Sequence, residues 1–202
     1  MKLGEAATSE ARRAAIKALL GRRSVPAQCL TAPGPDAAQI ATALDVALRA
    51  PDHGRMQPWR FRIIRGAARA KFSEALVAAA RVREPSLAAA QLEKLRARPL
   101  QVPLVIAASA RLRDNPKVPH IEQLLSTGAA VMNLLNAFHA QGFGAVWLTG
   151  PSAYDPAIAA ALGLGGDEQL LGFVYVGTIG AVVPAAPERP AQAGFVSEIQ
   201  PD

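Results

Sequence analysis

Cysteine is almost absent from this sequence of 202 residues, which contains only Cys29. A single cysteine excludes a disulfide within the chain and any metal site built from several cysteines. Nothing in the composition therefore demands an oxidising compartment, and we expect a cytoplasmic protein. The first residues contain no apolar core followed by a small-residue cleavage site, so we also expect no targeting signal.

Long hydrophobic runs and aromatic residues are also scarce. No run of about 18 uncharged apolar residues is present, so we expect no membrane segment. Half of the residues are hydrophobic and 19% are charged, which argues against intrinsic disorder. A chain of this length can bury a substantial core, and we expect one globular domain rather than two.

Basic residues are scarce in the second part of the chain. Residues 1–117 contain 21 of the 22 Lys and Arg residues but only 9 of the 16 Asp and Glu residues. Such an asymmetry can mark a nucleic-acid surface, but these basic residues are scattered and few aromatic side chains lie among them for base stacking. Positive potential would equally attract a phosphorylated cofactor or an anionic nucleotide. We therefore expect no nucleic-acid binding.

Several familiar catalytic and phosphate-binding patterns are missing. The sequence has no GxxxxGKS/T pattern and no GxGxxG that opens a helix after a strand. Cys29 has no base near it in the sequence, which argues against thiol catalysis. His53, His120 and His139 do not show HxH or HxxxH spacing, so no metal site is expected.

Apolar periodicity predicts six helices and four strands. Helices are expected over residues 9–20, 36–48, 67–84, 86–98, 120–141 and 155–164, and strands near residues 61–64, 102–110, 143–150 and 170–178. These strands could form one sheet covered by helices, in an α+β or an α/β arrangement, and periodicity alone does not choose between them. The proline-rich stretch after Gly180 is either disordered or laid across another surface.

A candidate anion site lies at the end of the first helix, where Arg22 and Arg23 precede Ser24. Two guanidinium groups and a hydroxyl offer the forked donors that suit a phosphate group. The alternative is that both arginines interact with the C-terminal dipole of the first helix.

The loop "RAPDHGRMQPW", residues 49–59, is a second candidate. His53 lies between Asp52 and Gly54 in a tight turn, where it is either functional or an ordinary surface histidine. Asp52 could orient His53 or hydrogen-bond the backbone of the turn. Arg49 could equally be a cation favoured at the end of its helix.

Four separated stretches together resemble the nitroreductase family of flavoproteins, in its compact, minimal branch. They are "RRSVP", "LRAPDHGRMQPWRFRII", "STGAAVMNLLNAFHAQGFGAVWLTG" and "LLGFVYVGT", and they occur in the family's order over roughly residues 15–180. The resemblance implies an α+β homodimer with a mostly antiparallel central sheet covered by helices. It implies one FMN-binding domain over residues 1–180 and a C-terminal tail, residues 181–202, that is swapped onto the partner subunit or frayed.

The resemblance also assigns residues to ligands. It implies FMN contacts from Arg22, Arg23, Ser24, Trp147, Leu148 and Thr149 of one subunit and from Arg49 and His53 of its partner. Some compact relatives carry a basic residue at the place of Leu148, which is apolar here and leaves Thr149 to offer a hydroxyl. The nicotinamide nucleotide is implied at Ala137, Phe138, His139, Ala140, Gln141 and Gly142, although His139 could simply be a polar residue at a helix end.

The implied reaction is ping-pong hydride transfer from NADH or NADPH through FMN to a nitroaromatic, quinone or similar small acceptor. No catalytic side chain is expected, because the flavin carries the chemistry. Arg22 or Arg49 would stabilise negative charge on the reduced ring. Two alternatives remain: a relative that uses the flavin for dehalogenation or flavin fragmentation, and a flavin carrier or sensor without turnover.

Overall fold

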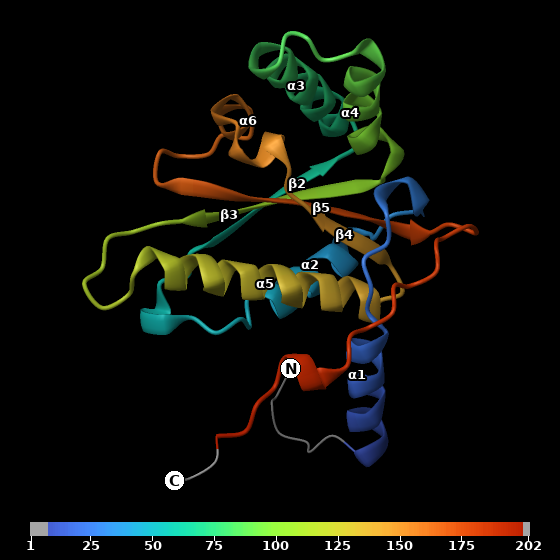
Figure 1. Cartoon of the computed structure of the whole chain (residues 1–202), viewed down its shortest axis with the longest axis vertical. Coiled ribbons are helices and arrows are strands. Elements are labelled where there is room, and N and C mark those ends of the chain that lie inside the picture. The colour runs from blue at the N-terminus through green and yellow to red at the C-terminus, as the bar shows by residue number, and fades with distance from the viewer. Residues whose placement is uncertain (1–7, 200–202) are drawn as a thin grey trace.

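A computed structural model describes residues 8–199 as an α+β fold around one five-stranded antiparallel sheet (Figure 1). The strands are β1 (Leu30–Thr31), β2 (Trp59–Arg65), β3 (Leu104–Arg111), β4 (Gly144–Leu148) and β5 (Glu168–Ile179). Their order is β1-β5-β3-β2, and β4 also pairs with β5. Every pair is antiparallel, which confirms the expected sheet. The first seven residues of the expected domain and the last three of the expected tail lie outside the described residues.

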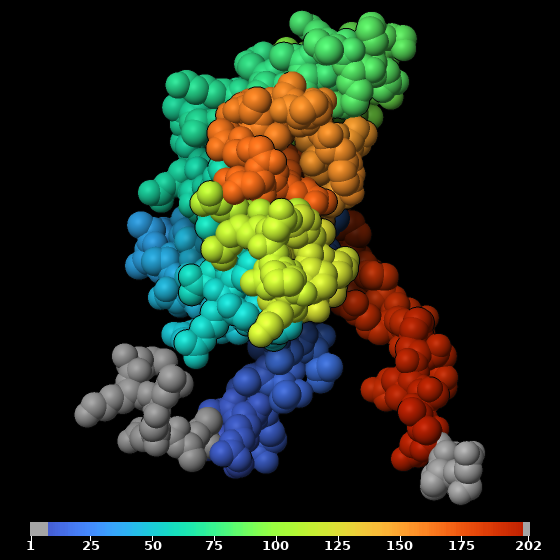
Figure 2. Space-filling model, turned by 90° about the vertical axis from the view of Figure 1, so that its left-hand side faces the viewer, coloured from blue at the N-terminus to red at the C-terminus, as the bar shows by residue number. Residues whose placement is uncertain are grey.

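Helices cover both faces of this sheet. They are α1 (Ser9–Gly21), α2 (Ala37–Ala47), α3 (Ala68–Arg83), α4 (Ala89–Gln101), α5 (His120–Ala140) and α6 (Pro156–Ala161), with short 3-10 turns η1 (Ala27–Cys29), η2 (His53–Arg55), η3 (Pro151–Tyr154) and η4 (Gln192–Gly194). Helices α2 and α5 lie on one face, and α3, α4 and α6 lie on the other (Figure 1). Helix α1 buries none of its side chains. Both this helix and the C-terminal tail project away from the sheet and its covering helices (Figure 2).

Strand β3 lies at the centre of two apolar cores. Successive side chains of a strand point to opposite faces, so Leu104 and Ile106 pack beneath α5 while Val105 and Ala107 pack beneath α3. All of its residues except the last are buried. This double burial explains why its sequence is an unbroken apolar run rather than an alternating pattern.

The structure departs from the expected elements at two places. Strand β1 lies inside the proline-rich connector, where its two residues pair with the end of β5 and Leu30 faces Ile179. No periodicity can reveal a strand of two residues. Helix α4 continues through Pro99 to Gln101 instead of ending before the proline. Pro99 lies in the last turn and is buried, so its packing offsets the missing hydrogen bond.

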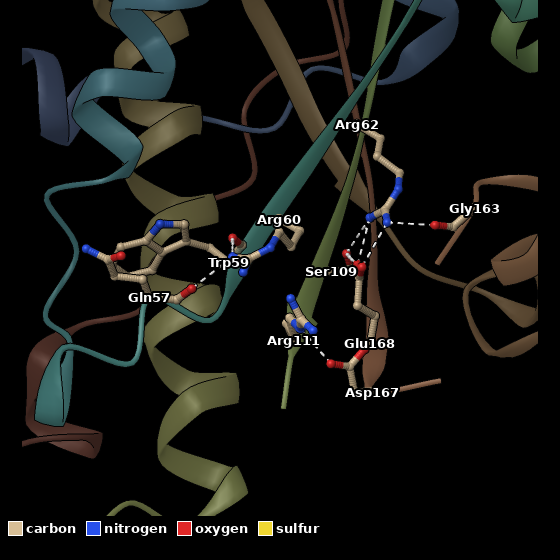
Figure 3. A network of polar contacts seen from close by, with 9 residues as sticks. All are labelled: Gln57, Trp59, Arg60, Arg62, Ser109, Arg111, Gly163, Asp167 and Glu168. Atoms are coloured by element: carbon tan, nitrogen blue, oxygen red, sulfur yellow. Dashed lines mark hydrogen bonds and ion pairs between the residues drawn. The ribbon is translucent and has the colours of Figure 1, made fainter. Parts of the chain in front are cut away.

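A part-buried polar network joins strands β2, β3 and β5 (Figure 3). The guanidinium of Arg62 on β2 donates to both carboxylate oxygens of Glu168 on β5, at 2.8 and 3.0 Å, and to the carbonyl of Gly163 at 3.0 Å. Ser109 on β3, which is fully buried, donates its hydroxyl to Glu168 at 2.8 Å. The hydrogen bond from Arg62 lowers the pKa of Glu168 to about 2, although burial opposes this shift.

This network predicts an acid-dependent loss of stability. Because the pKa of Glu168 is lower in the folded chain than its ordinary value of 4.5, its stabilisation is complete above pH 4.5 and is lost as the pH falls towards 2. We expect Glu168→Gln to lower the free energy of unfolding by about 2 kcal/mol at pH 7, measured by urea denaturation, and by less than half of that at pH 3.

Glu74→Gln is the matched control, because Glu74 also pairs with an arginine, Arg96, but its side chain is 64% exposed. An exposed pair contributes at most about 1 kcal/mol, so this variant should stay close to the wild type at both pH values. A Glu168→Gln deficit that did not change between pH 7 and pH 3 would contradict the role given to the carboxylate charge.

Candidate functional site

The Arg22–Ser24 segment lies directly beside the outer edge of β4. Helix α1 ends when the backbone N–H of Arg22 donates to the carbonyl of Ala18. Ser24 then forms a parallel bridge with Ala145, and the N–H of Val25 donates to the Ala145 carbonyl at 3.0 Å. Two stretches that are more than a hundred residues apart in the sequence, and that were both expected to bind FMN, are therefore neighbours in space.

The three expected residues at the end of β4 point to opposite faces of the sheet. Trp147 faces α5, lines a pocket of about 560 Å³ with Leu125 and Met132, and donates its indole N–H to the carbonyl of Leu171 at 3.1 Å. Leu148 and Thr149 line a different pocket, of about 510 Å³, together with Ser24. The structure thus brings Leu148, Thr149 and Ser24 together and places Trp147 on the other side of the strand.

The C-terminal tail adds an arginine that the sequence reasoning missed. Arg189 donates to the carbonyl of Arg22 at 3.0 Å, and Arg23 donates to the carbonyl of Pro184 at 2.6 Å. The contact of Arg23 therefore reaches the tail rather than the last carbonyls of α1. A signal was available, because Arg189 is the only Lys or Arg after residue 117.

The stretch expected to receive the nicotinamide nucleotide is only partly accessible. Ala137 is 7% exposed and Phe138 is fully buried, so both pack into the core beneath α5. His139 lies against the end of α1 and lines a small crevice of about 60 Å³ with Arg22 and Arg23. Ala140, Gln141 and Gly142 complete the stretch, and the Gln141 amide donates to the carbonyl of Gln39 at 3.2 Å.

The loop that carries His53 is held by its own side chains. The carboxylate of Asp52 accepts the backbone N–H groups of Met56 and Gln57 at 3.0 and 2.9 Å, so Asp52 shapes the turn instead of holding His53. His53 Nδ1 lies 2.6 Å from Glu122 Oε2, at the start of α5. The turn favours a glycine at position 54, where φ is +67°, although Arg55 and Gln57 also have positive φ values.

The candidate residues lie at opposite ends of α5. His53 contacts Glu122 in the first turn of this helix, whereas His139 in its last turn lies beside Arg22. A helix of 21 residues is about 30 Å long, so His53 and Arg22 of one chain are too far apart to touch one ligand. Arg49, which follows α2, is exposed, and its guanidinium has no ion pair or hydrogen bond within residues 8–199.

Helix α5 presents apolar side chains that the described part of the chain leaves exposed. Ile121 is 59% exposed, Leu125 is 65% exposed and Met132 is 42% exposed, and their spacing places them along one stripe of the helix. Val46 and Leu48 at the end of α2 are also exposed. Contiguous exposed apolar side chains of this kind are typical of a surface that another molecule covers.

The described part of the chain offers neither a cluster of metal-binding side chains nor a membrane-spanning helix. Residues 8–199 contain no group of three or more His, Cys, Asp or Glu side chains that could hold a metal ion. Within the same residues, no helix is both long enough and apolar enough to cross a bilayer.

Comparison with known proteins gives a consistent family. The model of the nitroreductase family matches residues 19–178. The Escherichia coli K12 protein named "Putative NAD(P)H nitroreductase YdjA" is 38% identical over 168 residues, which cover 81% of this chain and 87% of YdjA.

Solved structures show the same fold. A nitroreductase-like family protein from Bacillus cereus has a TM-score of 0.80 at 21% identity and covers 98% of this chain and 100% of its own. A mutant of NfnB, an FMN and NADPH-dependent nitroreductase from Sphingopyxis sp. strain HMH, has a TM-score of 0.73 at 19% identity, covering 91% of this chain and 98% of its own. The resemblance noted in the sequence is confirmed.

Gly172 on β5 sets the path of the end of β4. Its φ is +130°, and a Cβ there would lie 2.5 Å from the Leu148 carbonyl oxygen and 2.8 Å from Trp147 Nε1. We expect Gly172→Ala to lower the free energy of unfolding by about 2 kcal/mol or more, because the backbone strain and the clash add. Urea denaturation measures the loss, and faster hydrogen exchange at the Trp147 indole N–H would show its local origin.

Gly166→Ala is the matched control, because a Cβ there meets no atom within 4 Å and the backbone is not in the left-handed region. That variant should change stability by less than about 0.5 kcal/mol. Similar effects of the two substitutions would show that the close approach at Gly172 is not what matters.

Proposed function

This chain belongs to the nitroreductase family, and on that premise we propose that it is an FMN-dependent oxidoreductase. It takes hydride from NADH or NADPH and passes electrons to a nitroaromatic, quinone or similar small acceptor. The observation that carries the proposal is the meeting of the Arg22–Ser24 segment with β4. It places the Ser24 and Thr149 hydroxyls in one pocket, while Arg22 and Arg23 line a separate crevice.

The donors at this place fit the phosphate end of FMN. Arg22, Arg23 and Ser24 come from one side of β4, and Arg189 of the tail lies against Arg22. Guanidinium groups and hydroxyls form strong charge-assisted hydrogen bonds with phosphate oxygens. Bound FMN supplies the ring that accepts and releases hydride. The protein needs only to bind and orient it, which agrees with the absence of a catalytic triad from the sequence.

The remaining expected residues would contact the flavin ring and the nicotinamide nucleotide. Leu148 offers apolar surface and Thr149 a hydroxyl in the pocket that holds Ser24, whereas Trp147 offers apolar surface on the other face of β4. The exposed part of the nucleotide stretch, from His139 to Gly142, is the proposed contact for NADH or NADPH. We expect nucleotide and acceptor to use one site in turn, which is a ping-pong order.

We propose that the site is shared by two copies of the chain. His53 and Arg22 lie at opposite ends of α5 in one chain, and the exposed apolar stripe of this helix needs a cover. In a two-fold dimer whose α5 helices pack antiparallel, the partner subunit's His53 approaches the Arg22 end. In this arrangement Arg49, which is exposed and unpaired in residues 8–199, would contact the flavin held by the other subunit.

The tail fits the same arrangement. Residues 184–189 lie against Arg22 and Arg23, but Phe195, Val196 and Ile199 are all at least 70% exposed. Apolar side chains in such a segment gain stability only when a surface covers them. We propose that this arm packs on the partner subunit. The cytoplasmic location expected from the single cysteine stays a prediction.

The activity has a direct spectroscopic test. The purified protein, supplied with FMN, should show flavin absorbance that bleaches when NADH or NADPH is added anaerobically and returns when a nitroaromatic compound or a quinone is added. Absorbance spectra recorded after each addition check the sequence of events.

Two other spectroscopic outcomes would contradict the proposed activity. Bound flavin that neither nucleotide reduces would replace the proposal with a carrier or sensor, or with another flavin reaction. Protein that cannot take up FMN at all would overturn every flavin-dependent proposal.

A shared site also predicts complementation between two inactive variants. Arg22→Ala/Ser24→Ala damages the contribution of one subunit, and Arg49→Ala/His53→Ala damages that of the other. After joint unfolding and refolding of an equal mixture, about half of the dimers are mixed, and one of the two sites in each is intact. We expect about one quarter of wild-type FMN binding and reductase activity.

Each variant refolded alone is the control and should stay near its own low activity. A mixture no better than the average of the two variants, although mixed dimers are shown to form, would overturn the shared site.

A further inference from the structure

The pocket beside Leu148 has a second wall that comes from α4. On the β4 side it is lined by Ser24, Leu148 and Thr149, which provide two hydroxyls and no charge. On the opposite side it is lined by Arg98, in the last turn of α4. Arg98 is the only charged residue among the lining residues, so any positive charge that the pocket offers a ligand comes from this side chain.

Arg98 has no counter-ion in the described part of the chain. Arg96, two residues earlier on the same helix, pairs with Glu74 and Glu93, and these contacts raise its pKa. Arg83 at the end of α3 likewise pairs with Asp155. Arg98 makes no such ion pair or side-chain hydrogen bond in residues 8–199, so its donors remain available.

Arg98 lies beside the sheet, because it lines one pocket together with Val146 and Leu148 of β4. Tyr175 lies on β5, where it pairs with Val146 of β4, and it is 3% exposed. Burial raises the pKa of the Tyr175 hydroxyl to about 12, and the positive charge of Arg98 opposes that rise.

We propose that Arg98 is a phosphate-binding residue of this pocket, which donates to a phosphate group held between α4 and the hydroxyls of Ser24 and Thr149. The proposal deepens the function proposed above and rests on it. An arginine guanidinium opposite two hydroxyls matches the three acceptor oxygens of a phosphate monoester.

Two phosphates are candidates for this pocket. One is the phosphate of FMN, whose other proposed contacts adjoin the pocket at Ser24. The other belongs to NADH or NADPH, because the pocket shares Ala27, Gln28 and Arg98 with a neighbouring groove of about 670 Å³ that continues along α4 past Lys94. The chemistry is the same for both ligands, and affinity measurements separate them.

A simpler role for Arg98 makes a different prediction. A cation in the last turn of a helix is favoured by the helix dipole whether or not a ligand is present. Loss of that role would lower the stability of the chain slightly, but it would not distinguish a ligand with a phosphate from the same ligand without one.

The test is the affinity of Arg98→Gln for FMN and for riboflavin, measured by the quenching of flavin fluorescence during titration of the flavin-free protein. Loss of one charge-assisted contact should weaken FMN binding about tenfold and leave riboflavin within about twofold of the wild type. Arg98→Lys, which keeps the charge, should recover part of the loss. If the phosphate is that of the nucleotide, Arg98→Gln leaves both flavin affinities unchanged and raises the KM for NADPH or NADH.

Lys94→Gln is the matched control, because it removes one positive charge from the same helix but lines only the neighbouring groove. It should leave the FMN affinity within about twofold of the wild type. Equal weakening of FMN and riboflavin by Arg98→Gln, or no change in either flavin affinity or nucleotide KM, would overturn the proposal while the flavin function stood. Wild-type protein that bound no flavin would overturn both.

Discussion

The pairing of β4 on both of its edges is the constraint on which the proposed site depends. One edge is joined to β5, and the other is taken by the segment that leaves α1, through the Ser24–Ala145 bridge. Gly172 allows the end of β4 to lie close against β5, where any side chain would collide with the Leu148 carbonyl. These backbone contacts fix the hydroxyls of Ser24 and Thr149 in one pocket before any ligand binds, so little ordering remains when a ligand arrives.

Much of the scaffold could be predicted from local pattern, and the site could be predicted only in part. The long stripe of α5 and the unbroken apolar run of β3 each follow from burial that repeats along a single element. Arg22 and Ser24 were candidates from their donor groups and Thr149 from a resemblance, and the proximity of Ser24 to Thr149 became visible only in the sheet. Arg98 had no signal of its own, because its relation to Leu148 is created by the packing of α4 across the sheet and not by spacing in the sequence.

The uneven distribution of charge along the chain has a structural explanation. Four acids from the second part pair with bases from the first, in the pairs His53–Glu122, Arg62–Glu168, Arg83–Asp155 and Arg111–Asp167. The three arginines in these pairs use part of the excess of Lys and Arg that could have marked a nucleic-acid surface. Arg22, Arg49 and Arg98 have no carboxylate partner in residues 8–199, and all three are residues proposed here to meet a phosphate or a flavin. The positive charge left without a protein partner includes the charge that an anionic cofactor would use.

A site shared between two chains would couple ligand binding to assembly. Helix α1 buries no side chain in its own chain, and the apolar residues of the tail are exposed. Neither segment is therefore stabilised by packing against the core of its own chain. A ligand that contacts both subunits binds the dimer better than the separate chains, and by mass action it must stabilise the dimer in return. The same argument applies to the tail, because Arg189 touches the Arg22 segment while the apolar end of the tail remains to be covered. Flavin binding, packing of the tail on the partner subunit and dimer formation are then coupled equilibria. A substitution that weakens any one of them should weaken the other two.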